Sequence, residues 1–167
     1  QDCAAPNIVD DAHQTCSACS PGQEPNADRT ACVACEGTAY SSFGADCADC
    51  EAPNVVNTER TTCSACAAGT GPNADRTECV SCTGTTFSTI GQCQDCAAPN
   101  VISADRISCS ACAAGTGPNE DRTECVSCTG ATYSTMGQCQ TCGADEVPNA
   151  QRSGCTVCSA GMTSSAN

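Results

Sequence analysis

Residues 67–82 read AAGTGPNADRTECVSC, and residues 113–128 repeat this stretch with a single change, AAGTGPNEDRTECVSC. Both copies end in a C-x-x-C pair, and such pairs run through the chain of 167 residues. They hold all but one of the 21 cysteines, so most of the sulfur must be in disulfides, in metal sites or in reactive thiols. Cys3 stands alone, and the pairs are Cys16/Cys19, Cys32/Cys35, Cys47/Cys50, Cys63/Cys66, Cys79/Cys82, Cys93/Cys96, Cys109/Cys112, Cys125/Cys128, Cys139/Cys142 and Cys155/Cys158.

The composition favours disulfides over the other uses of sulfur. Aromatic residues make up 2% of the chain, tryptophan is absent, and the hydrophobic 40% consists largely of alanine and cysteine. A domain of this length normally buries a sizeable core, and chains that lack one rely on covalent cross-links. Because disulfides persist in oxidising compartments, we expect an extracellular protein.

Three kinds of spacer separate the pairs and recur in a fixed order. Residues 51–62, EAPNVVNTERTT, represent the first kind, residues 67–78 the second, and the shorter TGTTFSTIGQ at 83–92 the third. The complete unit returns every 46 or 47 residues. This period predicts repeat 1 at 1–47, repeat 2 at 48–93, repeat 3 at 94–139, a terminal half repeat at 140–158, and a flexible or anchor-proximal tail at 159–167.

Helix is disfavoured almost everywhere in the chain. Glycine and proline interrupt every spacer, and no useful length of sequence has the 3.6-residue apolar period of a helix. Pro-Asn recurs in each long spacer, where proline extends the residue before it and asparagine tolerates turns. We therefore predict a small disulfide-rich fold of short β-ribbons. Repeats of this size stack on their neighbours, which predicts an elongated rod of tandem cysteine-rich loops.

Two regular disulfide schemes fit the spacing, and spacing alone does not choose between them. One joins neighbouring pairs doubly, as Cys16–Cys32 with Cys19–Cys35, and leaves Cys3 over. The sequential scheme makes Cys3 open a complete loop and leaves Cys158 unpaired or bonded to another chain, so we prefer it. Its bridges are Cys3–Cys16, Cys19–Cys32, Cys35–Cys47, Cys50–Cys63, Cys66–Cys79, Cys82–Cys93, Cys96–Cys109, Cys112–Cys125, Cys128–Cys139 and Cys142–Cys155.

A basic residue stands ten positions after the opening cysteine of every long loop. A functional interpretation makes these residues a repeated ligand-binding ridge. The structural interpretation, which we favour, is that each arginine lies over a disulfide and bonds loop carbonyls or a neighbouring acid. The only histidine then replaces an arginine in a structural position. The residues are His13, Arg29, Arg60, Arg76, Arg106, Arg122 and Arg152.

The few bulky side chains also keep a fixed place in the repeat. We expect them to form miniature cores between adjacent loops. If some are exposed instead, they mark the place where chains meet. They are Tyr40, Phe87 and Tyr133 in the short spacers, Phe43, Ile90 and Met136 three residues later, and Val33, Val80, Val126 and Val157 within C-x-x-C pairs.

Other chemistries fit the sequence poorly. The paired C-x-x-C motifs resemble zinc-ribbon spacing, but no histidine alternates with cysteine. A thioredoxin-like redox site needs a strand-helix pattern that is not visible, and one histidine makes no catalytic triad. The net charge of −13, with six arginines and no lysine, is unsuited to nucleic acid or anionic membranes. We expect no enzymatic activity, no metal and no cofactor.

The C-x-x-C array, with the stretches at 67–82 and 113–128, resembles the cysteine-rich surface antigens of ciliates, the immobilisation antigens of Tetrahymena- and Ichthyophthirius-like cells. More distantly it is similar to furin-type and growth-factor-receptor cysteine-rich modules, whose simple loops use sequential pairing. The resemblance covers essentially the whole chain. It implies a location at the cell surface.

The tail after Cys158 consists of small and polar residues and ends at Asn167. Small residues remain where a glycolipid-anchor signal has been removed, and the family likeness makes Asn167 the candidate attachment residue. We therefore expect a non-enzymatic extracellular coat protein or antigen that meets neighbouring coat proteins or copies of itself, with the membrane reached only through the anchor. The alternatives are a self-assembling subunit of an extracellular filament or scale, and a receptor-like ligand-binding module.

Overall fold

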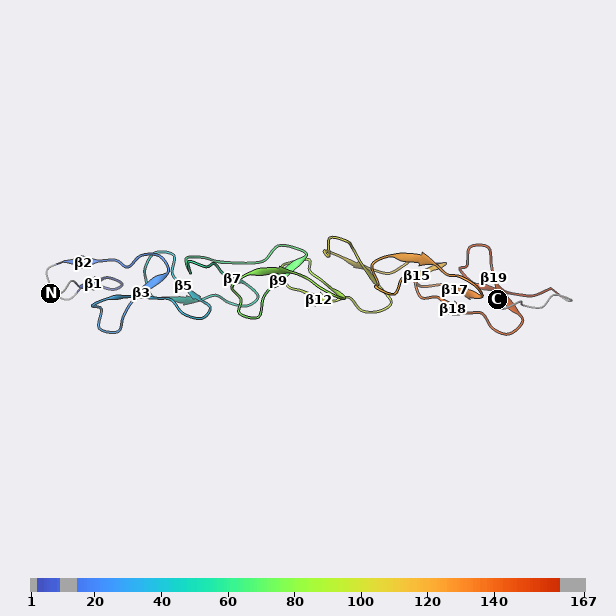
Figure 1. Ribbon diagram of the computed structural model, residues 1–167, viewed down its shortest axis with the longest axis horizontal. Helices are drawn as coiled ribbons and strands as arrows, with labels where there is room; N and C mark the ends of the chain where they lie inside the picture. The colour runs from blue at the N-terminus through green and yellow to red at the C-terminus, as the bar shows by residue number, and fades with distance from the viewer. Residues whose placement is uncertain (1–2, 10–14, 160–167) are drawn as a thin grey trace. The chain divides into compact units, whose positions relative to one another are not determined.

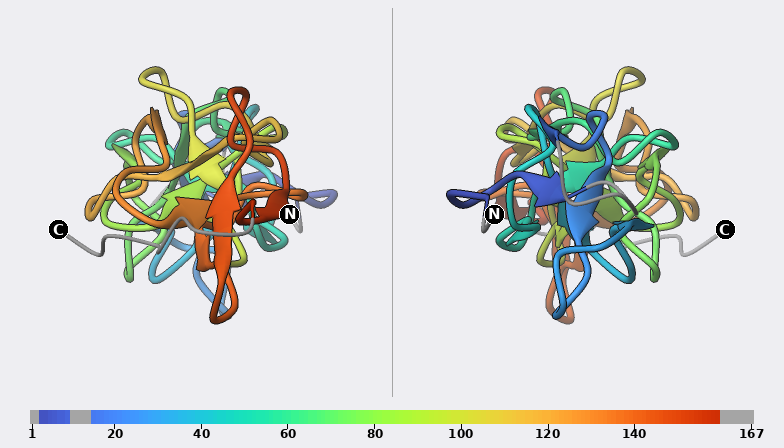
Figure 2. Two further views of the ribbon diagram at one scale, coloured as in Figure 1. Left: turned by 90° about the vertical axis from the view of Figure 1, so that its right-hand side faces the viewer. Right: turned by 90° about the vertical axis from the view of Figure 1, so that its left-hand side faces the viewer.

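The computed structural model of the protein describes residues 3–9 and 15–159. Within these residues there is no helix, and twenty short strands form ten separate antiparallel ribbons of two strands each (Figure 1). Figure 2 shows the ribbons from two further directions. The prediction of a small disulfide-rich fold of tandem loops with short β-ribbons is confirmed.

Every ribbon pairs two strands that are consecutive in the chain. In the first kind of spacer these are β1 (Ile8–Val9) with β2 (Cys16–Ser17), β7 (Val55–Val56) with β8 (Cys63–Ser64), and β13 (Val101–Ile102) with β14 (Cys109–Ser110). In the second kind they are β3 (Gln23–Pro25) with β4 (Cys32–Ala34), β9 (Thr70–Pro72) with β10 (Cys79–Ser81), and β15 (Thr116–Pro118) with β16 (Cys125–Ser127).

The short spacers contribute β5 (Ala39–Tyr40) with β6 (Ala48–Asp49), β11 (Thr86–Phe87) with β12 (Gln94–Asp95), and β17 (Thr132–Tyr133) with β18 (Gln140–Thr141). The terminal half repeat contributes β19 (Glu146–Pro148) with β20 (Cys155–Val157).

Ten disulfides close ten successive loops, which we number 1 to 10 in chain order. Each bridge spans 11 to 13 residues and encloses one hairpin turn, so no bridge joins two loops. A closed loop of this size is worth about 3 kcal/mol against the unfolded chain in the entropic model. The pairs are those of the sequential scheme: Cys3–Cys16, Cys19–Cys32, Cys35–Cys47, Cys50–Cys63, Cys66–Cys79, Cys82–Cys93, Cys96–Cys109, Cys112–Cys125, Cys128–Cys139 and Cys142–Cys155.

The turn of a long loop is built from its asparagine. In loop 5 the side-chain Oδ1 of Asn73 accepts hydrogen bonds from the amides of Thr77 (2.9 Å) and Glu78 (3.2 Å). The intervening Arg76 has a φ of 56°, in the left-handed region that reverses the chain. Asn26, Asn57 and Asn119 accept the same two bonds, and Asn149 accepts the first of them, from Ser153. In the second kind of spacer and in loop 10 this asparagine belongs to the Pro-Asn motif, whereas in loop 4 it is Asn57, three residues after that motif.

The buried interior consists mainly of sulfur. The buried apolar residues are Cys19, Cys35, Cys50, Cys66, Cys82, Cys96, Cys112 and Cys128, together with Val55, Val56, Val101 and Ile102. Cysteine bridges thus take the place of a hydrocarbon core, and among residues 3–9 and 15–159 the buried aliphatic side chains belong to strands β7 and β13.

The expectation that the other bulky residues form miniature cores is wrong for most of them. Phe43, Ile90 and Met136 are 86%, 77% and 83% exposed, and the valines within C-x-x-C pairs, Val33, Val80, Val126 and Val157, are exposed as well. A two-stranded ribbon has two faces and no neighbouring layer to cover both of them. Only Tyr40, Phe87 and Tyr133 are half-buried.

The chain divides into two compact units, Gln1–Ser81 with Ile90–Gln92 and Cys82–Thr89 with Cys93–Asn167. The first contains loops 1 to 5, and the second contains loops 7 to 10 with most of loop 6. None of the described segments is a helix long and apolar enough to cross a bilayer.

Candidate functional site

The repeated arginines form the junctions between long loops and the loops that precede them. Their main-chain carbonyls accept hydrogen bonds of 2.8 to 3.0 Å from amides of the preceding loop. Each described arginine of a long loop has a φ between 51° and 57°, so the turn directs that carbonyl toward its neighbour. The bonds run from Val9 to Arg29, Ser41 to Arg60, Val56 to Arg76, Ser88 to Arg106, Ile102 to Arg122 and Ser134 to Arg152.

The guanidinium groups make a second contact with the same preceding loop. In loop 5, Nε and Nη2 of Arg76 donate to the carbonyl of Asn54 at 3.1 and 3.0 Å, and Nη2 also donates to the carbonyl of Cys50. Arg122 of loop 8 repeats this arrangement on the carbonyls of Asn100 and Cys96. The structural interpretation of the arginines is confirmed here, because these side chains bond loop carbonyls.

The other four described arginines, Arg29, Arg60, Arg106 and Arg152, are held by Nη1 only. Nη1 of Arg106 donates to the carbonyls of Gly84 (2.9 Å) and Thr86 (3.3 Å), and Nη1 of Arg60 donates to the carbonyl of Gly37. Among the described residues, Nε and Nη2 of Arg60 and Arg106 make no hydrogen bond. These two side chains therefore keep donors for another partner.

Short loops contact the preceding loop through glycine. A Cβ placed on Gly44 would lie 1.9 Å from the carbonyl oxygen of Cys19, and one on Gly91 would lie 2.1 Å from that of Cys66. Gly137 meets Cys112 in the same way at 2.8 Å. Only glycine permits these approaches, which combine close backbone contact with a positive φ. Sequence reasoning missed these glycines, although each one follows the bulky residue of its short spacer.

A buried serine lies three residues before each of these glycines. The Oγ of Ser41 donates to the carbonyl of Ala45 at 2.8 Å. The Oγ atoms of Ser88 and Ser134 are buried without a hydrogen-bond partner. Loop 3 spans one residue more between its cysteines than loops 6 and 9 do, and that longer turn supplies the acceptor.

The serine and the glycine hold the exposed apolar residues in place. Phe43 lies between buried Ser41 and buried Gly44, and Ile90 and Met136 have the same neighbours in loops 6 and 9. The exposure of these side chains is thus set by a fixed backbone on both sides. A water-exposed apolar side chain on a fixed turn can dock onto another surface.

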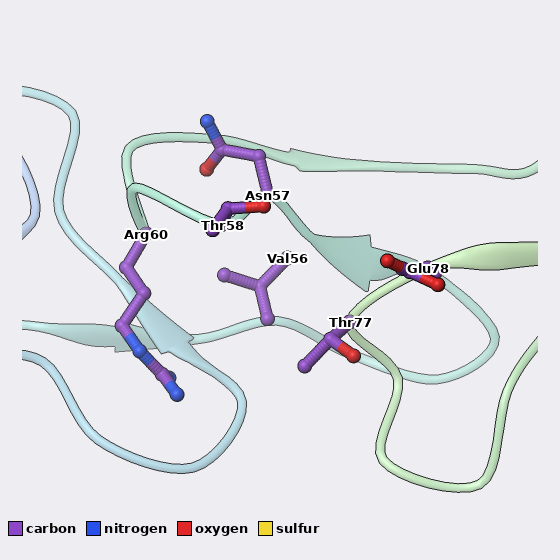
Figure 3. A pocket seen from close by; sticks show the side chains of 6 residues that line it. All are labelled: Val56, Asn57, Thr58, Arg60, Thr77 and Glu78. Carbon is purple, nitrogen blue, oxygen red and sulfur yellow. The ribbon is translucent and has the colours of Figure 1, made fainter.

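A groove of about 250 Å³ lies beside Arg60, at the junction of loops 4 and 5. Figure 3 shows Val56 in its middle, with Arg60 on one side and Thr77 and Glu78 on the other. Asn57 and Thr58 complete the lining. The groove thus combines an arginine, threonine hydroxyls and a carboxylate, whereas Val56 beneath them is only 1% exposed.

A second groove, of about 500 Å³, lies beside Arg106 in the other unit. Arg106 and Thr123 of this groove occupy the positions that Arg60 and Thr77 occupy one repeat earlier, 46 residues back. Its remaining lining is Gly84, Thr85, Glu120 and Asp121. Sequence reasoning placed each arginine but missed these partners, which come from the following long loop.

Loop 10 departs from the pattern at a single turn. Loops 2 and 8 have a buried glycine three residues after the opening cysteine, Gly22 and Gly115. A Cβ on Gly22 would lie 2.2 Å from the carbonyl oxygen of Glu59 in loop 4, and one on Gly115 would lie 2.3 Å from that of Gln151 in loop 10. Asp145 holds this position in loop 10, with a φ of 62° and an exposed side chain. A side chain at this position would meet a carbonyl in loops 2 and 8, so loop 10 differs from them here.

Cys158 is the one free cysteine of the described residues, and it is half-buried. Its amide donates to the carbonyl of Asp145 at 2.8 Å, as the amides of Cys35 and Cys128 do to Gly22 and Gly115. It thus occupies the position of a cysteine that opens a loop. Among the described residues no three or more His, Cys, Asp or Glu side chains are grouped to hold a metal ion. His13 and Asn167 lie outside the described residues.

No protein-family model and no curated protein matches this chain. The resemblance to ciliate surface antigens therefore stays a prediction.

Proposed function

We propose that the chain is a non-enzymatic extracellular structural protein of the cell surface, a coat or antigen component held by a glycolipid anchor. The observation that carries the proposal is that each of the ten bridges closes its own hairpin. Each loop is then stapled independently of its neighbours. Local damage leaves the other loops closed, which suits a protein exposed outside the cell.

The loop junctions support the same proposal. Main-chain bonds and arginine side chains join each long loop to the loop before it, so neighbouring loops support one another as in other repeat proteins. Disulfides at this density are typical of secreted and extracellular proteins. The net charge of −13 favours solubility at an exposed surface.

The proposal is tested with an antibody against the chain on intact cells of the source organism. We expect labelling without permeabilisation and release of the antigen by a phosphatidylinositol-specific phospholipase. The protein from that source should gain about two mass units per bridge on reduction and contain no stoichiometric zinc. Labelling that requires permeabilisation, or bound zinc with freely alkylated thiols, would contradict the proposal.

A second candidate function is a subunit that assembles with copies of itself. It is favoured by Phe43, Ile90 and Met136, which are each more than three quarters exposed on turns fixed by buried neighbours. Burial of one such side chain is worth about 1.5–3 kcal/mol, so three of them can hold a weak contact.

Sedimentation at increasing protein concentration tests this second function. We expect the mass to rise with concentration, and the triple variant Phe43→Ser, Ile90→Ser, Met136→Ser to remain monomeric. Cys158→Ser serves as a control that separates apolar association from disulfide exchange. A parent protein that stays monomeric at every concentration would contradict self-assembly and leave the coat function intact.

A further inference from the structure

We propose that the grooves beside Arg60 and Arg106 bind single rings of neutral saccharides, one ring in each groove. This inference is independent of the function proposed above. It starts from a partial recurrence, because each groove is lined by an arginine and by a threonine of the next long loop, at positions that lie 46 residues apart in the two units of the chain. The other four lining residues of each groove come from different positions in the repeat.

The arginines supply the first argument about chemistry. A guanidinium group has five N–H donors, and Arg76 and Arg122 use Nε and Nη2 on carbonyls of the preceding loop. Arg60 and Arg106 are anchored through Nη1 alone. They are therefore fixed in position and still hold unused donors at the edge of a groove.

The opposite walls supply acceptors. Glu78 faces the first groove, and Glu120 and Asp121 face the second. All three are exposed residues, and no hydrogen bond to their side chains is found within the described residues. Thr77 and Thr123 add hydroxyls to the two grooves.

This mixture of groups selects the ligand. Carboxylates at the rim and a net charge of −13 disfavour an anion. The arginine at the other wall disfavours a cation. A sugar hydroxyl both donates and accepts hydrogen bonds, so it can accept from the guanidinium while its neighbour donates to a carboxylate.

The size of the grooves limits the ligand to a small one. Sites for drug-sized ligands have volumes of roughly 300–1,000 Å³; the first groove, at about 250 Å³, lies below this range, and the second, at about 500 Å³, lies in its lower part. Each therefore fits a single ring at the end of a glycan. Affinity for one free ring should be weak, with binding observable at millimolar concentration.

The test is a titration of the isotope-labelled full chain with the methyl glycosides of glucose, galactose, mannose and N-acetylglucosamine, followed by NMR. N-acetylneuraminic acid and glucosamine serve as the anionic and cationic comparators. We expect at least one neutral glycoside to shift the amides of Asn57, Thr77 and Glu78, and those of Thr85 and Thr123.

Variants then assign the effect to the groove side chains. Glu78→Gln with Glu120→Gln and Asp121→Asn should weaken binding about tenfold, because each loses a charged acceptor. Their side chains make no structural hydrogen bond, so the fold should persist. Glu36→Gln and Asp95→Asn are matched controls at exposed carboxylates outside the grooves, and they should bind as the parent does.

Three results would overturn the proposal. The first is the absence of shifts with every neutral glycoside at millimolar concentration. The second is a response to N-acetylneuraminic acid or to glucosamine alone, which would assign an anion or a cation site. The third is neutral binding that the control variants weaken as much as the groove variants do.

Discussion

Long loops and short loops both contact the loop that precedes them, but they do so with opposite residues. A long loop uses an arginine, the largest polar side chain, whose carbonyl and guanidinium both bond the neighbour. A short loop uses a glycine. Its main chain packs against the carbonyl of the cysteine that opens the preceding loop. The left-handed conformation is common to both, with φ values of 56° at Arg76 and 72° at Gly44.

The difference shows what determines a junction in a chain without a core. In a long loop the arginine carbonyl bonds the main chain of the preceding loop directly, and the guanidinium group adds a second contact to it. In a short loop the main chain approaches the preceding loop so closely at the glycine that a side chain there would collide. The two kinds of loop therefore differ in whether the residue at the junction has room for a side chain.

The glycine contact gives the largest expected effect. Gly44→Ala places a Cβ against the Cys19 carbonyl, so the junction of loops 2 and 3 must open. We expect a loss of about 3 kcal/mol in local stability, from steric overlap and the left-handed backbone together. It is measured by hydrogen exchange of the Gly22 amide, which donates to the Ser41 carbonyl at 2.7 Å.

Gly37→Ala is the control within the same loop. Gly37 also has a positive φ, 58°, but a Cβ there would meet nothing within 4 Å. Gly37→Ala should lower the stability by about 1–2 kcal/mol, the cost of placing an alanine in the left-handed backbone conformation. Equal losses for Gly37→Ala and Gly44→Ala would mean that close approach does not determine the short-loop junction.

The two groups of arginines give the next effect. Arg76→Ala removes three hydrogen bonds to part-buried carbonyls and should cost about 2 kcal/mol. Arg60→Ala removes one bond and should cost about 1 kcal/mol or less. Both arginines have a φ of 56°, so the effect of alanine on the left-handed backbone is the same in the two variants and cancels in the comparison.

Exchange of two amides measures this difference. The Val56 amide donates to the Arg76 carbonyl, and the Ser41 amide donates to the Arg60 carbonyl. Protection of Val56 should fall about thirtyfold in Arg76→Ala, and protection of Ser41 should fall less in Arg60→Ala. A larger loss of amide protection in Arg60→Ala than in Arg76→Ala would show that the number of guanidinium hydrogen bonds does not determine the stability of a junction.

The buried serines of the short loops give a smaller effect of opposite sign. Ser41→Ala removes the hydrogen bond to Ala45 and should cost about 1 kcal/mol. Ser88→Ala removes a buried hydroxyl that has no partner, so it should be neutral or stabilising by up to about 1 kcal/mol. Denaturation with the disulfides intact compares the two variants. If Ser88→Ala were less stable than Ser41→Ala, the predicted order of the two variants would be wrong.

The smallest effect concerns a long-loop turn that has serine in the asparagine position. In loop 7 the Ser103 hydroxyl and the Ile107 amide donate to the Asp105 carboxylate and lower the pKa of that carboxyl below 3.8. A lowered pKa stabilises the folded turn above the unfolded pKa, and this contribution is lost as the pH falls through the folded pKa.

An NMR titration of the Asp105 carboxyl measures that contribution. Its midpoint should lie below 3.8 and should move up toward that value in Ser103→Ala, because the first cause of the shift is removed. Since the carboxylate is fully exposed, the change in stability should be too small to separate from error. An unchanged midpoint in Ser103→Ala would assign the shift to another donor.

The cysteine rhythm and the missing aromatics were sufficient for the fold class. Ribbons instead of helices follow from local sequence, because each hairpin lies within about fourteen residues of chain. Loops closed one by one were the preferred one of two disulfide schemes that fit the spacing. The structural position of the arginines was predicted from their fixed place in the repeat, although their contacts reach carbonyls 20 to 26 residues away. The bulky residues were predicted less well. Tyr40 is half-buried as expected, whereas Phe43, three residues later, is exposed.

Contacts between loops could not be predicted, because they join residues of different loops. The spacer sequences do not indicate that Gly44 contacts Cys19, or that Arg60 and Thr77 line one groove. Such contacts depend on how one hairpin rests on the next, which is a property of three-dimensional packing and not of spacing along the chain. The grooves and the arginines with unused donors became visible only with side-chain positions.

The sequence by itself determined that the chain forms short closed loops, and it limited their cysteine pairing to two regular schemes, because a disulfide across a short turn depends on nearby residues. Which face of a loop meets its neighbour, and which side chains stay in water, was decided by packing between loops. With almost no hydrocarbon to bury, hydrophobic pattern carries little information here, and the geometry of main-chain contacts replaces it.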